Sequence, residues 1–375
     1  MSVGLVLAAA TAASAQTSGS IRVALVESTR AAELRGSDIE ISDLGACVRC
    51  GSGPASGPWT AAVVRAVADG GGVAIDRRAA PGFRLRSARP IRLNGREYAG
   101  PLDVVRNGAG IAVVSELALE DYIVGVLRAE AGEKWPLEAL RAQAVVARTY
   151  AAYHRQLNAG KPYHIVASTV HQQFAGRVPA TSPVWDAARD TAGQVLLWEG
   201  EVFPAFYHTE SGGYTEDPRM VFAARNMPAL KPVRCEFSTG SPHFFWSLDV
   251  RLADLTEILR KNDVAVGSVT GVEVSERTPS LRAAAITVHG TRGSARLRGN
   301  DFRRMVGYDT FKSTLFAVAV DAQWARFSGR GYGHGVGMCQ WGAKGMAEQG
   351  YGARKILEFF YPGTTLGTLS ARAAR

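Results

Sequence analysis

The carboxyl group of Glu130 is the first group in the chain whose surroundings suggest chemistry. It ends an apolar segment, VGVLRAE, and Gly132 follows shortly after it. A carboxyl placed against apolar walls at the lip of a cleft has a raised pKa and stays protonated, as a general acid for glycosidic bond cleavage requires. The alternative interpretation is a solvated glutamate at a helix end that pairs with Arg128 or Lys134. Spacing alone leaves both interpretations open.

A second group of polar residues follows on the next helical segment and comprises Gln143, Arg148 and Tyr150. Arg148 lies four residues after Ala144 and three before Ala151, on a face otherwise made of small residues. An arginine on such a face either extends along the surface to solvent or pairs with a buried carboxylate. The sequence does not distinguish the two.

A Ser-Gly-Gly turn lies within the segment YHTESGGYTED, residues 207–217. Its hydroxyls and backbone N–H groups are close together, which suits a sugar or an anion. His208 and Ser211 could act as base and nucleophile. The segment is not G-x-S-x-G and has no strand–turn–helix context around it, so support for a serine hydrolase is weak.

Glycine occupies every second position from 329 to 337 in the segment GRGYGHGVGMCQWGAKGMA. Such a loop lets the backbone approach a ligand or another segment closely. It lacks G-x-x-x-x-G-K-[ST], which excludes a nucleotide-binding P-loop. His334 is a candidate catalytic imidazole or metal ligand, or it simply hydrogen-bonds local backbone. Gln340 and Trp341 combine an amide with an indole face, a pairing that suits sugar hydroxyls and the apolar side of a pyranose ring.

The four cysteines fall into two pairs. Cys47 and Cys50 form a single C-x-x-C, and without a second one a four-thiolate zinc site is unsupported. No βαβ pattern surrounds them, which argues against a thioredoxin-like function. Cys235 and Cys339 flank the segment 243–325, so we expect a disulfide that ties the base of this segment to the core. The alternative is two free buried thiols.

The spacing of apolar residues predicts the elements that carry these groups. From Leu119 to Leu127 they recur at three- and four-residue intervals, which predicts a helix over 118–130. A second helix opens at Pro136 and ends before Asn158. Asn107-Gly108-Ala109 between two apolar runs predicts a hairpin.

These elements predict an α+β fold, with a mixed core around two central helices. We expect a β-rich N-terminal domain at 16–94, a core at 95–242 and 326–375, and a small inserted α/β domain at 243–325. Short helices are expected near 254–260, 343–349 and 356–361, and strands at 269–276 and 283–290.

Composition narrows the class of protein. The chain has 375 residues, is 46% hydrophobic and has a formal net charge of +9, which favours anionic partners. The basic residues are scattered, without a nucleic-acid-binding motif, so we expect no nucleic acid partner. No apolar stretch is long enough to span a bilayer. MSVGLVLAAATAASAQ has an apolar stretch and a small-residue ending at Ala15, which predicts a signal peptide over 1–15 and export to an oxidising compartment.

Taken together, four stretches resemble the SpoIID/LytB family of exported bacterial cell-wall proteins. They are ALEDYIVGVLRAE (118–130), EALRAQAVVARTYA (138–151), FYHTESGGYTE (206–216) and GYGHGVGMCQWGA (331–343). Their order and spacing also fit the family, and the resemblance covers about residues 95–368, interrupted by the 243–325 region.

The resemblance implies a function in the periplasm or cell-wall space. SpoIID is a lytic transglycosylase acting on glycan strands stripped of stem peptides, and LytB is called an amidase enhancer. The family's catalytic glutamate falls on Glu130, so we expect cleavage of the β-1,4 bond between N-acetylmuramic acid and N-acetylglucosamine with 1,6-anhydro ring formation. The alternative is a non-catalytic glycan-binding enhancer of an N-acetylmuramoyl-L-alanine amidase. The expected substrate-binding residues are Gln143, Arg148, Tyr150, Gln172, His208, Ser211, Gly212, Gly213, Tyr214, Thr215, His334, Gln340 and Trp341.

The chain departs from the family in one stretch. Some members carry a His and two Cys after the arginine helix, which form a zinc site. Here the stretch reads KPYHIVASTVHQQFAGR, with the Q-x-aromatic-x-G ending at Gln172 to Gly176 but no cysteine. His164 and His171 alone are too few ligands for structural zinc, which normally takes four. We therefore expect no metal and no other cofactor.

Overall fold

The structure is a computed structural model and describes residues 19–45, 57–222 and 227–369. The expected signal peptide and the Cys47/Cys50 pair lie outside these residues. The described chain divides into two compact units: the first takes its residues from 1–133, 147–195 and 366–369, and the second from 134–146 and 196–365. No helix among the described residues combines the length and apolar character needed to cross a membrane.

Over the described residues, eleven strands of the first unit form one sheet. They are β1 (Ser20–Thr29), β2 (Ala31–Leu44), β3 (Trp59–Asp69), β4 (Gly72–Ile75), β5 (Arg78–Ala80), β6 (Gly82–Arg86), β7 (Ile91–Leu93), β8 (Arg96–Tyr98), β9 (Leu102–Asn107), β10 (Gly110–Ala118) and β11 (Ile165–Val166). The order is β11-β1-β10-β9-β6-β2-β3-β4-β5, with β7 on β2 and β8 on β7. Six consecutive buried residues open β10, because this strand lies inside the sheet between β1 and β9.

The predicted hairpin at Asn107–Ala109 is confirmed. β9 and β10 pair antiparallel, from Asn107 opposite Gly110 to Leu102 opposite Ser115. Gly108 takes a φ of 57°, a conformation that glycine adopts without a steric penalty. The sheet therefore continues well beyond residue 94, where the sequence changes character.

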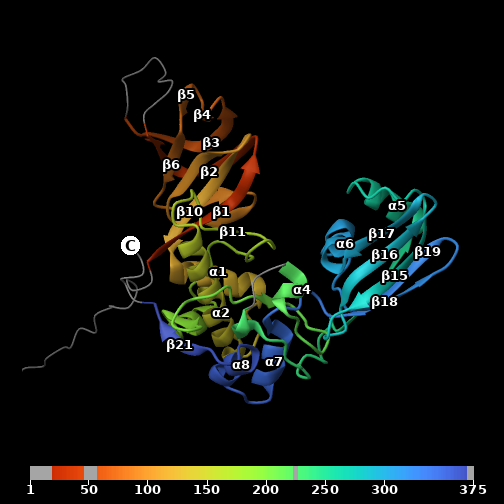
Figure 1. Cartoon of the computed structure of the whole chain (residues 1–375). Helices are drawn as coiled ribbons and strands as arrows, with labels where there is room; N and C mark the ends of the chain where they lie inside the picture. Colours follow the sequence, from red (N-terminus) through yellow and green to blue (C-terminus); the bar gives the residue numbers. More distant parts are fainter. Residues whose placement is uncertain (1–18, 46–56, 223–226, 370–375) are drawn as a thin grey trace, which may run out of the picture. The chain divides into compact units, whose positions relative to one another are not determined.

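Three helices follow along the chain, and the first two carry the first candidate residues. They are α1 (Leu119–Glu130), α2 (Leu137–Leu157) and α3 (Val184–Asp190), and α1 follows β10 without a loop (Figure 1). The predicted helices over 118–130 and 136–157 are thus confirmed to within a residue. α1 buries an apolar face that includes Tyr122, Ile123 and Leu127. The residues of α2 up to Val146 belong to the second unit and those from Ala147 onward to the first.

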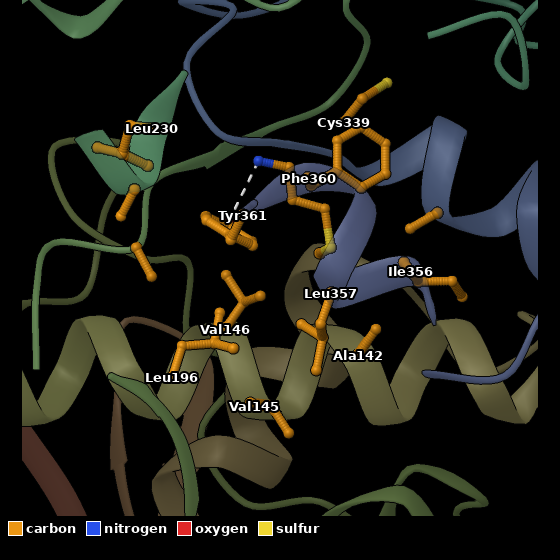
Figure 2. Close-up of a cluster of buried hydrophobic side chains, with 14 of the residues drawn as sticks. Ala142, Val145, Val146, Leu196, Leu230, Cys339, Ile356, Leu357, Phe360 and Tyr361 are labelled. Atoms are coloured by element: carbon orange, nitrogen blue, oxygen red, sulfur yellow. Dashed lines mark hydrogen bonds between the residues drawn. The ribbon is translucent and has the colours of Figure 1, made fainter. Parts of the chain in front are cut away.

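The second unit contains a hydrophobic cluster built on the first half of α2. Its elements are β13 (Tyr207–His208), α4 (Pro218–Phe222), a 3-10 turn (Pro228–Leu230), β20 (Met338–Cys339), α7 (Gln340–Glu348) and α8 (Ala353–Phe360). Two short strands, β12 (Gln194–Leu197) and β21 (Thr365–Thr368), each begin in one unit and end in the other. Figure 2 shows Ala142 and Val146 of α2 with Leu357 and Phe360 of α8 in this cluster. The Tyr361 hydroxyl donates to the Phe206 carbonyl at 2.7 Å and accepts from the Met338 N–H at 3.2 Å.

A second hydrophobic cluster of this unit is formed by residues between 246 and 327. Its elements are β14 (Phe245–Arg251), α5 (Leu252–Arg260), β15 (Val269–Arg277), β16 (Ala283–Gly290), β17 (Gly293–Arg298), α6 (Gly299–Val306), β18 (Phe316–Val320) and β19 (Trp324–Arg330). One three-stranded sheet has the order β14-β19-β18 and the other β15-β16-β17. The aromatic rings of Phe302, Phe311 and Phe327 are fully buried among them. The fold is α+β, as predicted.

Gly125 of α1 generates a test of this packing. A Cβ at this position would lie 2.2 Å from the ring of Phe174, and the Gly125 carbonyl accepts the Ala175 N–H at 3.1 Å. Alanine normally stabilises a helix relative to glycine. We expect the opposite for Gly125→Ala, a loss of about 1–3 kcal/mol of unfolding free energy from overpacking, measured by urea denaturation.

Gly160→Ala is the matched control, since a Cβ there meets no atom within 4 Å. It should change the unfolding free energy by less than about 0.5 kcal/mol. Equal stabilities of the two variants would contradict the close contact between Gly125 and Phe174.

Candidate functional site

Glu130 is the last residue of α1, and its side chain is half-buried. Its Oε1 accepts a hydrogen bond from the backbone N–H of Gln173 at 2.6 Å. The negative end of the helix dipole opposes charge on this carboxylate, whereas the Gln173 N–H favours it. Arg128 pairs with Glu133, with 3.6 Å between Nε and Oε1. The carboxyl is thus held in a fixed orientation at a partly accessible helix end.

The segment that donates to Glu130 is anchored by the residues on either side of Gln173. The buried Gln172 accepts from the Tyr122 hydroxyl at 3.1 Å and donates to the Ala147 carbonyl at 3.3 Å. The ring of Phe174 packs on Tyr122 with 5.2 Å between centroids. Gln172 therefore orients the backbone beside Glu130, and its fully buried amide has no surface for a substrate.

Arg148 pairs with a carboxylate, which is one of the two alternatives that the sequence left open. Its side chain is 0% exposed, and its Nη2 lies 2.7 Å from Oε2 of Glu120, whose side chain is 20% exposed. A second donor reaches Oε1 of Glu120 at 2.9 Å, and Nη1 donates to the Gln194 carbonyl at 3.0 Å. Glu120 also accepts the Gly193 N–H at 3.1 Å. Arg148 therefore joins α2, α1 and the segment after α3, and substrate contact by this guanidinium is not supported.

Tyr150 lies in an aromatic group with two histidines of the first unit. Its ring lies 4.4 Å from that of His154, which lies 4.7 Å from that of His171. Burial and the neighbouring His171 lower the pKa of His154 to about 4, and burial lowers that of His171. These imidazoles are thus neutral near pH 7, and Tyr150 is itself buried.

His164, the other histidine considered for a metal, is engaged with Arg22. Its Nδ1 accepts the Arg22 backbone N–H at 3.1 Å, and burial together with Arg22 and Arg155 lowers the pKa of His164 to about 4. Among the described residues, no three His, Cys, Asp or Glu side chains are grouped closely enough to hold a metal ion. That the protein needs no metal stays a prediction.

In the second unit, two of the singled-out stretches lie side by side. β13 pairs in parallel with β20, Tyr207 with Met338 and His208 with Cys339. Beyond this pair, Glu210 and Tyr332 exchange backbone hydrogen bonds at 2.9 and 2.8 Å. A Cβ on Gly337 would lie 1.9 Å from the Phe206 carbonyl oxygen, so the alternating glycines allow this close approach.

The turn at Ser211 to Thr215 is held mainly by its own neighbours. Gly212 and Gly213 take φ values of 72° and 105°, and the Ser211 hydroxyl accepts the Gly213 N–H at 3.3 Å. Thr215 exchanges bonds with Val233, whose N–H donates to the threonine hydroxyl at 2.7 Å. Tyr214 is 38% exposed, so within this turn it offers a side-chain surface.

His208 and His334 hydrogen-bond to local backbone rather than to the Ser211 hydroxyl. His208 Nδ1 lies 3.1 Å from the Val336 carbonyl oxygen, which implies an Nδ1–H donor. His334 Nδ1 accepts the Val336 N–H at 3.0 Å. Burial, with the charges of Arg303 and Arg282, lowers the pKa of His334 to about 3. Neither ring hydrogen-bonds Ser211 in the described structure, so it holds no Ser-His nucleophile pair.

Two buried carboxylates and a buried arginine fix this turn, and the sequence analysis did not single them out. Glu210 accepts from the Gly212 N–H at 2.9 Å and from the Ser238 hydroxyl at 2.5 Å. Arg282 donates to the Ser211 carbonyl at 2.6 Å. Glu216 accepts from the hydroxyls of Thr278 and Ser280 at 2.6 and 2.7 Å. The loop between β15 and β16 thus holds both ends of the Ser211 turn, although it is remote in sequence.

Cys235 and Cys339 are free, buried thiols, so the disulfide expected from the sequence is absent from the structure. The two side chains hydrogen-bond each other, and this bond lowers the pKa of Cys235, while burial raises that of Cys339. Cys339 Sγ also accepts the N–H groups of Ser211 at 3.3 Å and Gly342 at 3.2 Å. Cys339 therefore caps α7 and supports the Ser211 turn.

Trp341 is half-buried and lies among aromatic rings of the same unit. Its ring is 5.7 Å from that of Trp135, which the sequence analysis missed, and the ammonium of Lys344 lies 5.0 Å from its centroid. Gln143 and Gln340 are buried, and both amide atoms of Gln143 have no hydrogen-bond partner among the described residues. The indole pair is the part of this group that can offer an apolar face.

The expected substrate-binding residues therefore divide by exposure. The buried side chains, which have little surface to offer a ligand, are Gln143, Arg148, Tyr150, Gln172, His208, Ser211, Thr215 and Gln340. Glu130, Tyr214, His334 and Trp341 keep accessible surface. The fixed backbone of the turn and the accessible carboxyl are features that a polymer-binding protein could use.

The Glu120–Arg148 pair predicts a large stability effect. Arg148→Met leaves the carboxylate without its partner and should lower the unfolding free energy by about 3–5 kcal/mol, measured by chemical denaturation. Arg189→Met removes an exposed pair with Asp186, whose side chains are each 65% exposed. This control should cost less than about 1 kcal/mol. Similar losses in both variants would contradict the role of Arg148.

Because these histidines are neutral in the folded state, we expect the unfolding free energy to fall as the pH is lowered. The pKa values are about 4 for His154 and His164 and about 3 for His334, against about 6.5 in unfolded chains. Below pH 6.5 the unfolded state binds protons that the folded state does not, so unfolding free energy falls between pH 6.5 and 4. Each group contributes up to about 1.4 kcal/mol per pH unit.

Urea denaturation from pH 7.5 to 4.5 measures this slope, and His154→Phe should reduce it. Burial raises the pKa of Glu210, which acts in the opposite direction, because a carboxyl with a raised pKa in the folded state stabilises that state when it takes up a proton. Unchanged stability between pH 7 and 5 would contradict the burial of neutral imidazoles.

Comparison with protein families matches residues 107–198 to the family described as SpoIID, stage II sporulation protein. Residues 232–337 match a domain of unknown function. The first match contains α1, α2 and Glu130. The second contains the β14–β19 region together with Cys235 and the first part of the glycine loop.

Individual relatives extend this similarity. An uncharacterised protein of Brachyspira hyodysenteriae is 33% identical over 275 residues, which are 73% of this chain and 73% of that protein. The amidase enhancer of Bacillus subtilis is 31% identical over 74% of this chain, which spans 45% of that protein's length. Stage II sporulation protein D of Bacillus subtilis is 27% identical over 69% of this chain and 77% of its own length. The chain therefore belongs to the SpoIID family.

Proposed function

We propose that the protein is an exported lytic transglycosylase that cleaves peptidoglycan glycan strands. The observation that carries the proposal is the carboxyl of Glu130, half-buried at the end of α1 and oriented by the Gln173 N–H at 2.6 Å. A general acid has to present its proton along one direction, and a carboxyl fixed through one oxygen meets this requirement. Membership of the SpoIID family supports the same assignment.

In the proposed reaction, Glu130 protonates the glycosidic oxygen between N-acetylmuramic acid and N-acetylglucosamine. The bond from C1 to this oxygen breaks, and an oxocarbenium-like centre develops at C1. The resulting carboxylate then takes the proton of the muramoyl 6-hydroxyl, whose oxygen bonds to C1 and closes the 1,6-anhydro ring. One carboxyl serves both steps, so a second catalytic acid is not needed.

The packing around Glu130 supports this assignment in two ways. Gln172 and Phe174 hold the donor segment through buried contacts with Tyr122. Arg148, which is fully buried, and Glu120 tie α1 to α2, which keeps the helix in place. Among the residues of the second unit, we propose that Tyr214 and Trp341 contact sugar, because these side chains keep accessible surface.

Glu130→Gln tests the catalytic role on glycan freed of stem peptides. The amide keeps the size of the side chain but carries no titratable proton, so release of anhydro-muramoyl ends should fall by about 10²–10⁴-fold. Binding of the glycan should survive. Mass spectrometry of the released fragments measures the reaction.

Glu133→Gln is the matched control, because this neighbouring glutamate is 38% exposed at its side chain and pairs only at 3.6 Å with Arg128. It should retain wild-type activity. Equal activity of the Glu130 and Glu133 variants would remove Glu130 from the mechanism.

The alternative function is a non-catalytic, glycan-binding enhancer of an amidase. The similarity to the amidase enhancer of Bacillus subtilis favours it, over the part of that protein which the chain spans. A wild-type protein that stimulates an added N-acetylmuramoyl-L-alanine amidase, yet releases no anhydro ends by itself, would select this alternative.

A further inference from the structure

The β14–β19–β18 sheet has one face that is covered by the hydrophobic cluster and one that is open. Side chains alternate between the two faces, and in β14 the buried Trp246 lies between the exposed Phe245 and Ser247. Pairing places Ser247 opposite Ser328, and Ser328 opposite Ala317 on the third strand. The open face therefore has a row of small side chains across all three strands.

Larger side chains border this row at one end and create a cavity of about 690 Å³. Phe245, paired with Arg330 on the next strand, is 74% exposed, and Leu281 is 51% exposed. The ring of Phe245 is supported by Phe244, with 4.9 Å between centroids. An exposed aromatic ring that packs on a neighbouring ring, beside a floor of small residues, gives an apolar contact surface.

Two positive charges face this cavity without an acidic partner among the described residues. The guanidinium of Arg277 donates to the carbonyls of Leu281 at 2.7 Å and Phe316 at 3.0 Å, which fix its position but leave its charge. Arg330 also lines the cavity and forms no ion pair in the described structure. Arg326, on the same face of β19, instead pairs with Asp321 and, at 3.8 Å, with Asp249. The charge is therefore unbalanced at the cavity end of the face.

The cavity adjoins the Ser211 turn. A Cβ on Gly212 would lie 2.7 Å from the Leu315 side chain and 3.1 Å from that of Arg330, and both of these residues line the cavity. A linear polymer bound at the turn could therefore continue over Arg330 onto the open sheet face.

We propose that this cavity binds a segment of peptide-free glycan strand, with the ring of Phe245 against a sugar face and Arg277 and Arg330 on the lactyl carboxylate of muramic acid. The inference rests on the proposed function for its substrate and names a site within the region that matches a domain of unknown function. Each part of the cavity has a matching group on the glycan. The apolar faces of the sugar rings and the acetyl methyl groups would pack on the aromatic wall. The one carboxylate of each muramic acid would pair with the unbalanced positive charge. Removing the stem peptide exposes this carboxylate, so the site distinguishes stripped from peptide-bearing strands.

The test compares two tetrasaccharides binding to the full chain carrying Glu130→Gln, which prevents cleavage. One is peptide-free (GlcNAc-MurNAc)₂ and the other is chitotetraose, which lacks the lactyl carboxylate. The muramic acid compound should bind more tightly, and salt should weaken its binding. Phe245→Ala should weaken both compounds about tenfold.

Arg277→Gln and Arg330→Gln should each weaken the muramic acid compound about tenfold or more and leave chitotetraose nearly unchanged. Arg326→Gln is the matched control and should bind both compounds as the parent does, because its charge is already paired. All four positions have accessible side chains, so circular dichroism should show the parent fold.

If the Phe245, Arg277 and Arg330 variants bound both compounds as tightly as the parent, the cavity assignment would be overturned. The proposed function would then still be tested separately, by cleavage with the wild-type protein. Binding of a free stem tetrapeptide that these variants lose would assign the cavity to peptide and overturn it as well. Absence of both glycan binding and cleavage in the parent and wild type would overturn the two proposals together.

Discussion

Arg148 brings a positive charge into a part of the first unit where its side chain has no exposed surface, and Glu120 has to neutralise it there. An unpaired buried charge costs several kcal/mol, so α1 and α2 are constrained to the one arrangement that joins these two side chains. The carbonyls of Gln194 and Ala188 take further guanidinium donors and extend the constraint to the chain around α3. Glu130 lies ten residues beyond Glu120 on the same helix, and its position therefore follows from this ion pair.

The second unit has a comparable constraint, which comes from the close approach of two backbone segments rather than from a buried charge. The strand pair β13–β20 requires two segments of the chain to approach so closely that a Cβ on Gly333 or Gly337 would collide with His208 or the Phe206 carbonyl. The buried carboxylates Glu210 and Glu216 then satisfy the N–H and hydroxyl groups around the Ser211 turn. Because Arg282 and Glu216's partners come from the β15–β16 loop, this turn depends on the region with the open sheet face.

Local pattern was sufficient for the elements with strong periodicity. The helices over 119–130 and 137–157 and the hairpin at Asn107–Ala109 are the clearest cases, since their apolar spacing and turn residues agree with the burial they reach. The register of the long N-terminal strands and the continuation of their sheet through β10 depend on pairing between distant segments, which no local pattern specifies. The partners of Arg148 and Glu216 were equally out of reach, because each lies 28 or more residues away.

The sequence identified many residues of the candidate site but predicted the roles of only some of them. Arg148, Gln172 and His208 were singled out by type and position, yet burial makes them supports of the backbone rather than groups that meet a substrate. His334 keeps some accessible surface, but its Nδ1 already accepts the Val336 N–H. Glu130 lies at a helix end, as its sequence context suggested, and its side chain is half-buried; its catalytic role stays a proposal.

The most direct test of that chemistry is the fate of solvent oxygen when purified wild-type protein cleaves peptide-free glycan in H₂¹⁸O. Ring closure by the muramoyl 6-hydroxyl predicts anhydro-muramoyl products without ¹⁸O, because no water attacks C1. Products that carry ¹⁸O at C1 of the muramoyl residue would identify a hydrolase and contradict the account, as would the absence of any cleavage.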